Sequence, residues 1–195
     1  MHALQPTLMS VLWPVADGRA RWLRPVLLAF AGAFAITVAA KIKVPFYPVH
    51  MTMQTFVVLA IGMAYGWRLG AATIALYLAQ GAVGLPVFTG TPEKGIGVAY
   101  MVGPTGGYLL GYLMAALTTG WLAERGWDRN ALTTAAAMLI GNVMIFAPGL
   151  LWLGILFGWD KPILAWGLTP FIWAEVFKMG LATAMLPMAW RLLSK

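Results

Sequence analysis

The sequence predicts an all-α membrane protein with six transmembrane helices and both termini in the cytoplasm. Of its 195 residues, 61% are hydrophobic and only 10% are charged, and the mean hydropathy is +0.80. A soluble domain usually carries about 25% charged residues. Several tryptophans lie near the ends of apolar runs, where amphipathic rings favour the headgroup level of a bilayer; they are Trp22, Trp67, Trp121, Trp127 and Trp159.

Six apolar runs approach or exceed the length of about 20 residues that a membrane-spanning helix needs. They lie at about residues 25–44, 50–66, 69–88, 101–123, 132–158 and 163–190. The second run is short, and the fifth is long enough to cross at a tilt. The first is too long for the core of a signal peptide and lacks a small-residue cleavage site, so we expect it to be retained. No repeat or soluble segment interrupts the pattern, which predicts a single integral membrane domain over residues 1–195.

The basic residues predict the orientation, because cytoplasmic loops carry an excess of lysine and arginine. With the N-terminus inside, eight fall in cytoplasmic segments: Arg19, Arg21, Arg24, Arg68, Arg125, Arg129, Arg191 and Lys195. Four fall in outer segments: Lys41, Lys43, Lys94 and Lys161. All seven arginines therefore lie on one side, which favours cytoplasmic termini in the plasma (inner) membrane.

The composition argues against several other classes of function. The basic residues at the span ends explain the net charge of +7, and no basic run interleaved with aromatic residues predicts nucleic-acid binding. The chain has no cysteine, and His2 and His50 are too few and too far apart for a metal centre. The glycine-rich segment GPTGGY lacks the lysine of a nucleotide-binding loop, and no nucleophile–base pair is recognisable. We therefore expect no cofactor and no catalysis by this chain.

A charged pair inside the last apolar run is the strongest sign of a binding site. Glu175 and Lys178 lie three residues apart and share one face of a helix. Ionisable groups at membrane depth are costly and usually face the protein interior. A structural ion pair that only holds helices together is the alternative. The predicted topology places this pair just beneath three outer connections, 41–51, 86–100 and 159–166.

The outer connections contain the residue types of a small-molecule site. The stretch 84–100 is rich in glycine and proline, as expected for a re-entrant or lid segment. Glu175 can accept N–H groups and Lys178 can donate to a carbonyl, which suits an amide-like ligand. Other candidates that could donate, accept or offer flat contact surface are Thr52, Gln54, Gln80, Asn142, Phe46, Tyr47, Phe88, Tyr100 and Tyr108.

Four segments also carry a resemblance to a known family. In chain order they read VPFYPVHMTMQTFVVLAIG, LYLAQGAVGLPVF, VGPTGGYLLGY and PFIWAEVFKMGLA. They resemble successive signatures of the BioY family, the biotin-specific substrate-binding (S) subunits of energy-coupling factor (ECF) transporters, over about residues 28–190. The resemblance implies the ECF S-component fold and capture of biotin at the outer side. It also implies as partners a transmembrane scaffold (T) subunit and two ATPase subunits, which would hydrolyse ATP.

The resemblance also suggests roles for individual residues. Glu175 and Lys178 match the acid and lysine that contact the ureido ring of biotin in the family, where aspartate is the commoner acid. Lys94 is the candidate for the basic residue that meets the valerate carboxylate, although arginine is usual and Glu93 lies beside it. Gln80 matches a polar position where asparagine is usual. Phe46, Gln54 and Tyr108 complete the expected biotin site.

An alanine strip in the first apolar run predicts a docking surface. Ala31, Ala35 and Ala39 recur every four residues, and Ala29 and Ala33 form an adjacent strip. Small residues at this spacing let helices approach closely. In S subunits such a strip docks the scaffold subunit, and packing within the chain is the alternative.

Two other functions fit a small membrane protein of this composition. A transporter driven by an ion gradient would show inverted repeats and a site at the midplane, and no repeat is visible. An intramembrane enzyme would need a catalytic set that the sequence lacks. The sequence is compatible with a homo-oligomer.

Overall fold

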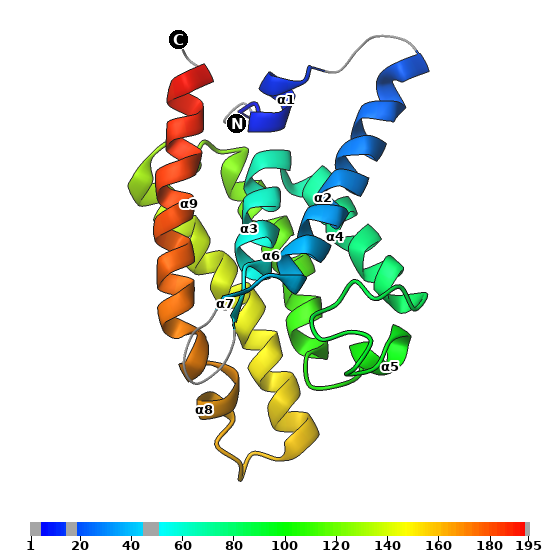
Figure 1. The fold of residues 1–195 in the computed structure, drawn as a ribbon. Coiled ribbons are helices and arrows are strands. Elements are labelled where there is room, and N and C mark those ends of the chain that lie inside the picture. The colour runs from blue at the N-terminus through cyan, green and yellow to red at the C-terminus, as the bar shows by residue number, and fades with distance from the viewer. Residues whose placement is uncertain (1–4, 15–18, 45–50, 194–195) are drawn as a thin grey trace.

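Helices dominate the computed structural model, which describes residues 5–14, 19–44 and 51–193 (Figure 1). The long helices are α2 (Leu23–Lys41), α3 (Gln54–Tyr65), α4 (Trp67–Ala82), α6 (Gly106–Ala123), α7 (Ala131–Phe157) and α9 (Ile172–Leu193). The short ones are α1 (Leu8–Leu12), η1 (Arg19–Trp22), α5 (Gly97–Met101), α8 (Ile163–Gly167) and η2 (Thr169–Phe171). Strands β1 (Lys43–Val44) and β2 (Met51–Thr52) pair antiparallel, with Lys43 opposite Thr52.

The helix boundaries follow local chemistry. The side chain of Asn130 caps α7 by accepting a hydrogen bond of 2.8 Å from the backbone N–H of Leu132. Gly66 alone separates α3 from α4, with a φ of 81° that residues with a side chain rarely adopt. The chain reverses there, so that Gln54 at the start of α3 reaches Tyr77 near the end of α4.

The long helices overlap the six predicted spans in order, but they differ in length. Three described segments are long and apolar enough to cross a membrane alone: Leu23–Lys41, Ala131–Phe157 and Ile163–Leu193. With 12 and 16 residues, α3 and α4 rise only ~18 and ~24 Å at 1.5 Å per residue, whereas the hydrocarbon core of a bilayer is ~30 Å thick. The glycine link between α3 and α4 and the proline- and glycine-rich connection after α4 account for this shortening.

The centre of the bundle is α6, which packs against α7, α3 and α4. Glycines make these contacts close: a Cβ added to Gly111 would lie 2.7 Å from the Cα of Ile145 on α7, and one added to Gly120 would collide with the backbone N of Trp67 on α4. Fully buried apolar side chains such as Val58, Ile74 and Met138 fill the remaining space. Small residues at helix contacts are typical of association in membranes, where dispersion contacts matter more than the hydrophobic effect.

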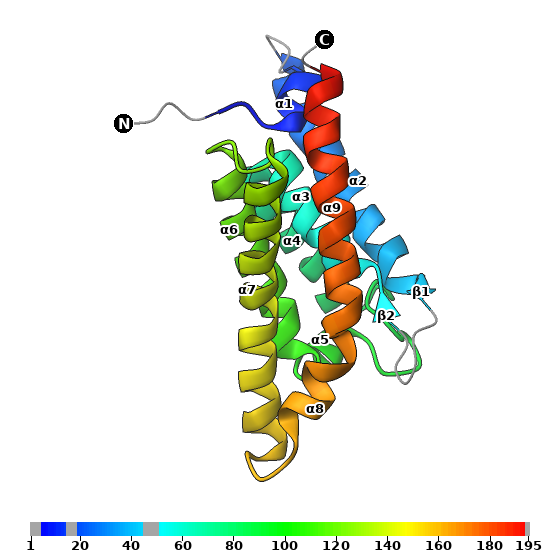
Figure 2. The ribbon, with the colours of Figure 1, turned by 90° about the vertical axis from the view of Figure 1, so that its left-hand side faces the viewer.

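The bundle has two chemically different ends. At one, here called the α1 end, lie α1, the last turn of α9 and the α6–α7 link; at the other, the cavity end, lie α8 and the connection 83–96 (Figures 1 and 2). A hydrogen bond of 2.6 Å from Arg24 to the carbonyl of Met9 ties the start of α2 to α1.

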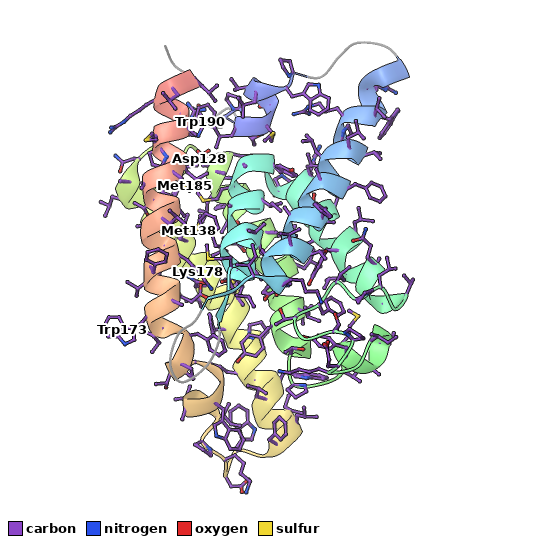
Figure 3. The ribbon with its side chains drawn as sticks, in the orientation of Figure 1. Asp128, Met138, Trp173, Lys178, Met185 and Trp190 are labelled. Carbon is purple, nitrogen blue, oxygen red and sulfur yellow. The ribbon has the colours of Figure 1, made fainter. Side chains whose placement is uncertain are left out.

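A buried carboxylate fastens α9 at the α1 end. Asp128, in the α6–α7 link, is completely buried and accepts a hydrogen bond of 2.5 Å from the indole N–H of Trp190 on α9 (Figure 3). The Arg129 guanidinium lies 4.3 Å from the centre of the Trp190 ring. Burial raises the pKa of the Asp128 carboxyl above its ordinary value, while the Trp190 hydrogen bond opposes this shift.

The connection 83–96 is held to the helices by backbone carbonyls. Lys41, the last residue of α2, donates hydrogen bonds to the carbonyls of Phe88 and Thr91, each 2.9 Å long. The hydroxyl of Tyr100 donates to the carbonyl of Thr89 over 2.8 Å. The Phe88 ring stacks on Tyr100 with 4.9 Å between ring centres, and it fills the space that a Cβ at Gly81 would occupy.

Gly81→Ala should therefore loosen this connection. The added methyl collides with the Phe88 ring, so we expect a loss of about 1 to 3 kcal/mol in unfolding free energy, as for other overpacked cores. Gly180→Ala is the matched control, because nothing lies within 4 Å of a Cβ at Gly180 in α9. Thermal unfolding in detergent and proteolysis after Lys94 measure the difference. Equal unfolding midpoints for the two variants would contradict the packing of Phe88 against Gly81.

Trp190→Phe should destabilise the α1 end in a pH-dependent way. The substitution keeps the aromatic bulk but removes the indole N–H that donates to the buried carboxylate, which costs about 1 to 3 kcal/mol. Since the pKa of Asp128 is raised in the folded state, stability falls as pH rises from the ordinary carboxyl value through the raised one. The defect should therefore be larger at neutral pH than in acid. Adding Asp128→Asn, which removes the charge, should abolish this dependence in thermal unfolding; an unchanged pH profile would argue against the buried charge.

Candidate ligand site

A cavity of about 430 Å³ opens at the cavity end between α3, α6, α7, α8 and α9, with the connection 83–96 forming one wall. Its size is in the range of small-molecule sites. The aromatic part of its lining consists of Phe88, Tyr100, Tyr108, Tyr112, Phe146, Phe157, Trp166 and Phe171. The polar part consists of Thr52, Gln54, Thr55, Thr89, Lys94, Thr105, Glu175 and Lys178. The cavity is thus mostly flat and apolar, with polar groups that converge from different elements.

The charged pair lies in this lining as a three-membered cluster. Glu175 and Lys178 are buried on the first turns of α9, and Lys178 Nζ lies 2.7 Å from Glu175 Oε1. Thr55, on the first turn of α3, donates to the same carboxylate oxygen over 2.8 Å and accepts a hydrogen bond of 2.8 Å from Lys178. Figure 3 shows Lys178 on the side of α9 that faces the bundle, whereas Trp173 points away from it. The helix N-terminus also favours the negative charge of Glu175.

The cluster leaves unused hydrogen-bonding capacity in the cavity lining. Glu175 Oε2 is buried and has no hydrogen-bond partner within the described chain. An unpaired buried acceptor of this kind is costly, and ligand binding can satisfy it. Lys178 has three N–H donors, of which Thr55 and Glu175 accept two. The cluster can therefore accept one N–H and donate one hydrogen bond to a carbonyl that lies beside it.

Two predicted site residues line the cavity with their polar atoms already bonded. The Tyr108 hydroxyl donates to the carbonyl of Gly167 over 2.8 Å, which holds α8 against α6 and leaves the ring to line the cavity. Gln54 is buried, donates to the Tyr77 hydroxyl over 2.6 Å and accepts from Thr89 over 3.0 Å. Each side chain thus shapes the wall, and Gln54 also anchors the connection 83–96.

Of the other predicted site residues, some line the cavity and some do not. Lys94 lines the cavity from its exposed rim, with its alkyl chain against Gly90. Gln80 is not part of the lining: Tyr77 and Gly81 take the inward positions of α4 and Gln80 is partly exposed, so the expectation of a ligand contact there is not supported. Phe46 lies outside the described residues. Asn142 is buried on α7 and its amide atoms have no hydrogen-bond partner among the described residues, but it is not part of the lining either.

Several residues line the cavity although no sequence pattern identifies them as site residues. Thr55 is the most important, because it bonds both members of the charged pair. Its place beside Gln54 in the polar start of an apolar run was the available signal. Phe146 and Phe171 come from α7 and η2, and single phenylalanines in apolar runs look the same whether they face a cavity or lipid.

The alanine strip of α2 is only partly at the surface. Ala31 and Ala35 are exposed, whereas Ala39 is buried with 3% exposure, so the predicted docking strip must be corrected to its first two members. Four residues turn an α-helix by about 400°, so successive members drift by ~40° around the axis and the third reaches the core side. In the adjacent strip, Ala33 is fully buried in the core and Ala29 is partly buried. No cluster of metal-ligating residues occurs in the described part of the chain.

Two biotin transporters are similar to most of this chain. The biotin transporter BioY of Thermotoga maritima is 35% identical over 154 residues, covering 78% of this chain and 88% of that protein. That of Rhodobacter capsulatus is 38% identical over 165 residues, covering 76% and 84%.

A solved structure identifies the fold, and a family model identifies the family. The crystal structure of the S-component for biotin from an ECF-type ABC transporter matches with a TM-score of 0.71 and 22% identity, covering 92% of this chain and 96% of that chain. At this identity the match shows the fold, so the predicted S-component fold is confirmed. The model described as the BioY family matches residues 9–195. The family indicated by the four sequence motifs is thereby confirmed, and the chain belongs to the BioY family.

Proposed function

We propose that this protein is the biotin-binding membrane subunit of a biotin uptake system. The observation that carries the proposal is that no described residue bonds Oε2 of Glu175, which lies beside a Lys178 N–H not used within the described chain, in an aromatic cavity. A cyclic urea such as the ureido ring of biotin presents N–H groups next to a carbonyl, which matches these two atoms. Relatives that cover most of this chain are biotin transporters.

The rest of the cavity suits the remainder of biotin. The rings of Tyr108 and Phe146 meet edge to face, with 5.8 Å between their centres, and can flank the bicycle. Lys94, which lines the exposed rim, would meet the carboxylate at the end of the valerate chain. Phe46 and Gln54 remain part of the proposed site, Gln54 by holding the wall through Thr89.

We also propose the orientation and the partners. Arginines gather at the α1 end, while Lys41 and Lys94 lie at the cavity end, so the positive-inside rule favours a cytoplasmic α1 end and a cavity open to the outside of the plasma membrane. Delivery of biotin would pass through an ECF module, with a T subunit that docks on Ala31 and Ala35 and two ATPases that hydrolyse ATP. We assign no reaction to this chain.

Glu175→Gln and Lys178→Ala should each weaken biotin binding by about 2 kcal/mol or more, because each removes a charged partner from a buried ligand hydrogen bond. Titration calorimetry on the purified protein in detergent measures the change. Gln80→Ala is the control, since Gln80 lies outside the cavity lining, and its affinity should stay close to wild type. Unchanged affinity in both charge variants, with normal elution and unfolding, would rule out this site.

Ala35→Leu should impair assembly with the T subunit and leave biotin affinity unchanged, because Ala35 lies on the exposed face of α2 and not in the cavity lining. Ala147→Leu is the matched control: it adds the same bulk to an exposed position on α7. Co-purification with the T subunit and calorimetry with biotin, on the same samples, separate the two effects. If the Ala35 variant assembled fully with the T subunit, this face of α2 would not be part of the docking surface.

A further inference from the structure

A second hollow, lined by none of the residues of the ligand cavity, lies on the outside of the bundle toward the α1 end. It is a groove of about 450 Å³ between α4 and α6, lined by Trp67, Leu117, Thr118 and Trp121. Trp121 is nine residues beyond Tyr112, the last α6 residue of the ligand cavity, which places them ~14 Å apart along the helix. The backbones of α4 and α6 touch at Gly120, so the two tryptophans that flank the groove are held at a fixed spacing.

An arginine accompanies each of these tryptophans. The Arg68 guanidinium lies 5.0 Å from the centre of the Trp67 ring, and that of Arg125 lies 3.5 Å from the centre of the Trp121 ring. Arg125 also donates a hydrogen bond of 2.9 Å to the carbonyl of Trp121, which orients its planar group. Both arginines are exposed. The inside of the groove is therefore mostly apolar, and the guanidinium groups of Arg68 and Arg125 lie at its edges beside the two tryptophans.

No ion pair with a described residue compensates these two positive charges. Among the described residues, no carboxylate lies within ion-pair distance of either guanidinium. Glu124, which precedes Arg125 in the sequence, instead accepts a hydrogen bond of 3.3 Å from the backbone N–H of Trp67 and is partly buried beneath the α3–α4 link. The groove thus presents net positive charge at the level where tryptophan and arginine meet the headgroups of a bilayer.

We propose that this groove binds an anionic phospholipid from the leaflet at the α1 end. An acyl chain would lie along Leu117 and the tryptophan rings, and the headgroup phosphate would meet the guanidinium groups of Arg68 and Arg125. Guanidinium pairs with phosphate through two parallel hydrogen bonds and stays charged while it stacks on an aromatic face. Basic sites between helices on the cytoplasmic side are known to hold anionic lipid headgroups. This inference is independent of what the ligand cavity binds.

The test compares phosphatidylglycerol with phosphatidylcholine of identical acyl chains. Native mass spectrometry of the full chain in detergent measures how much of each lipid is retained, and phosphatidylglycerol should be preferred. Arg68→Gln and Arg125→Gln should each lower its apparent affinity about fivefold. Arg129→Gln is the matched control, because Arg129 stacks on Trp190 at the same end but outside the groove, and it should leave the preference intact.

A second variant tests the apolar part without a change of charge. Leu117→Trp fills the groove from an exposed position on α6 and should reduce retention of the same lipid while thermal unfolding stays normal. Equal retention of the two lipids by wild type, or the same loss for Arg129→Gln as for Arg68→Gln, would overturn the proposal in favour of general attraction by the basic surface. Full retention by Leu117→Trp would also overturn it.

Discussion

The contact that joins Glu175, Lys178 and Thr55 is the interaction on which the cavity end depends. Two charges buried in an apolar bundle are costly unless each meets its partner, and removing either leaves the other unpaired at a cost of about 3 to 5 kcal/mol. Thr55 adds a third member from a different helix, so the pair joins α9 to α3 instead of satisfying only itself. The start of α9, the start of α3 and the cavity between them are therefore positioned by one shared set of hydrogen bonds.

The same cluster is incompletely satisfied. Glu175 Oε1 takes two hydrogen bonds, while Oε2 takes none from the described residues although it is buried. A cluster built only to hold helices would be expected to satisfy both oxygens, since unpaired buried acceptors are rare. The imbalance favours a binding role over the purely structural ion pair, and it locates the binding capacity on one oxygen and one ammonium N–H.

Around this cluster, the two ends of the bundle use cations in different ways. At the cavity end, Lys41 donates hydrogen bonds to backbone carbonyls of the connection 83–96 and so holds a wall of the cavity in place. At the α1 end, arginines lie over indole rings, with Arg125 on Trp121 and Arg129 on Trp190. A compact ammonium suits several carbonyls at once, whereas a planar guanidinium suits an aromatic face and a headgroup phosphate. The proposed ligand site and the proposed lipid groove follow from this division.

The sequence by itself determined the apolar runs, the side on which the arginines gather and the pairing of Glu175 with Lys178, because these depend on composition and on spacing along one helix. Its four motifs also indicated the family. Only the tertiary structure decided that Thr55 completes the charged cluster, that Phe146 and Phe171 line the cavity, that Gln80 does not, and that Ala39 turns into the core. These properties depend on how far each helix is rotated and on which helix lies beside it. In a chain that is apolar on nearly every face, hydrophobic periodicity does not reveal that rotation; contacts between distant segments set it.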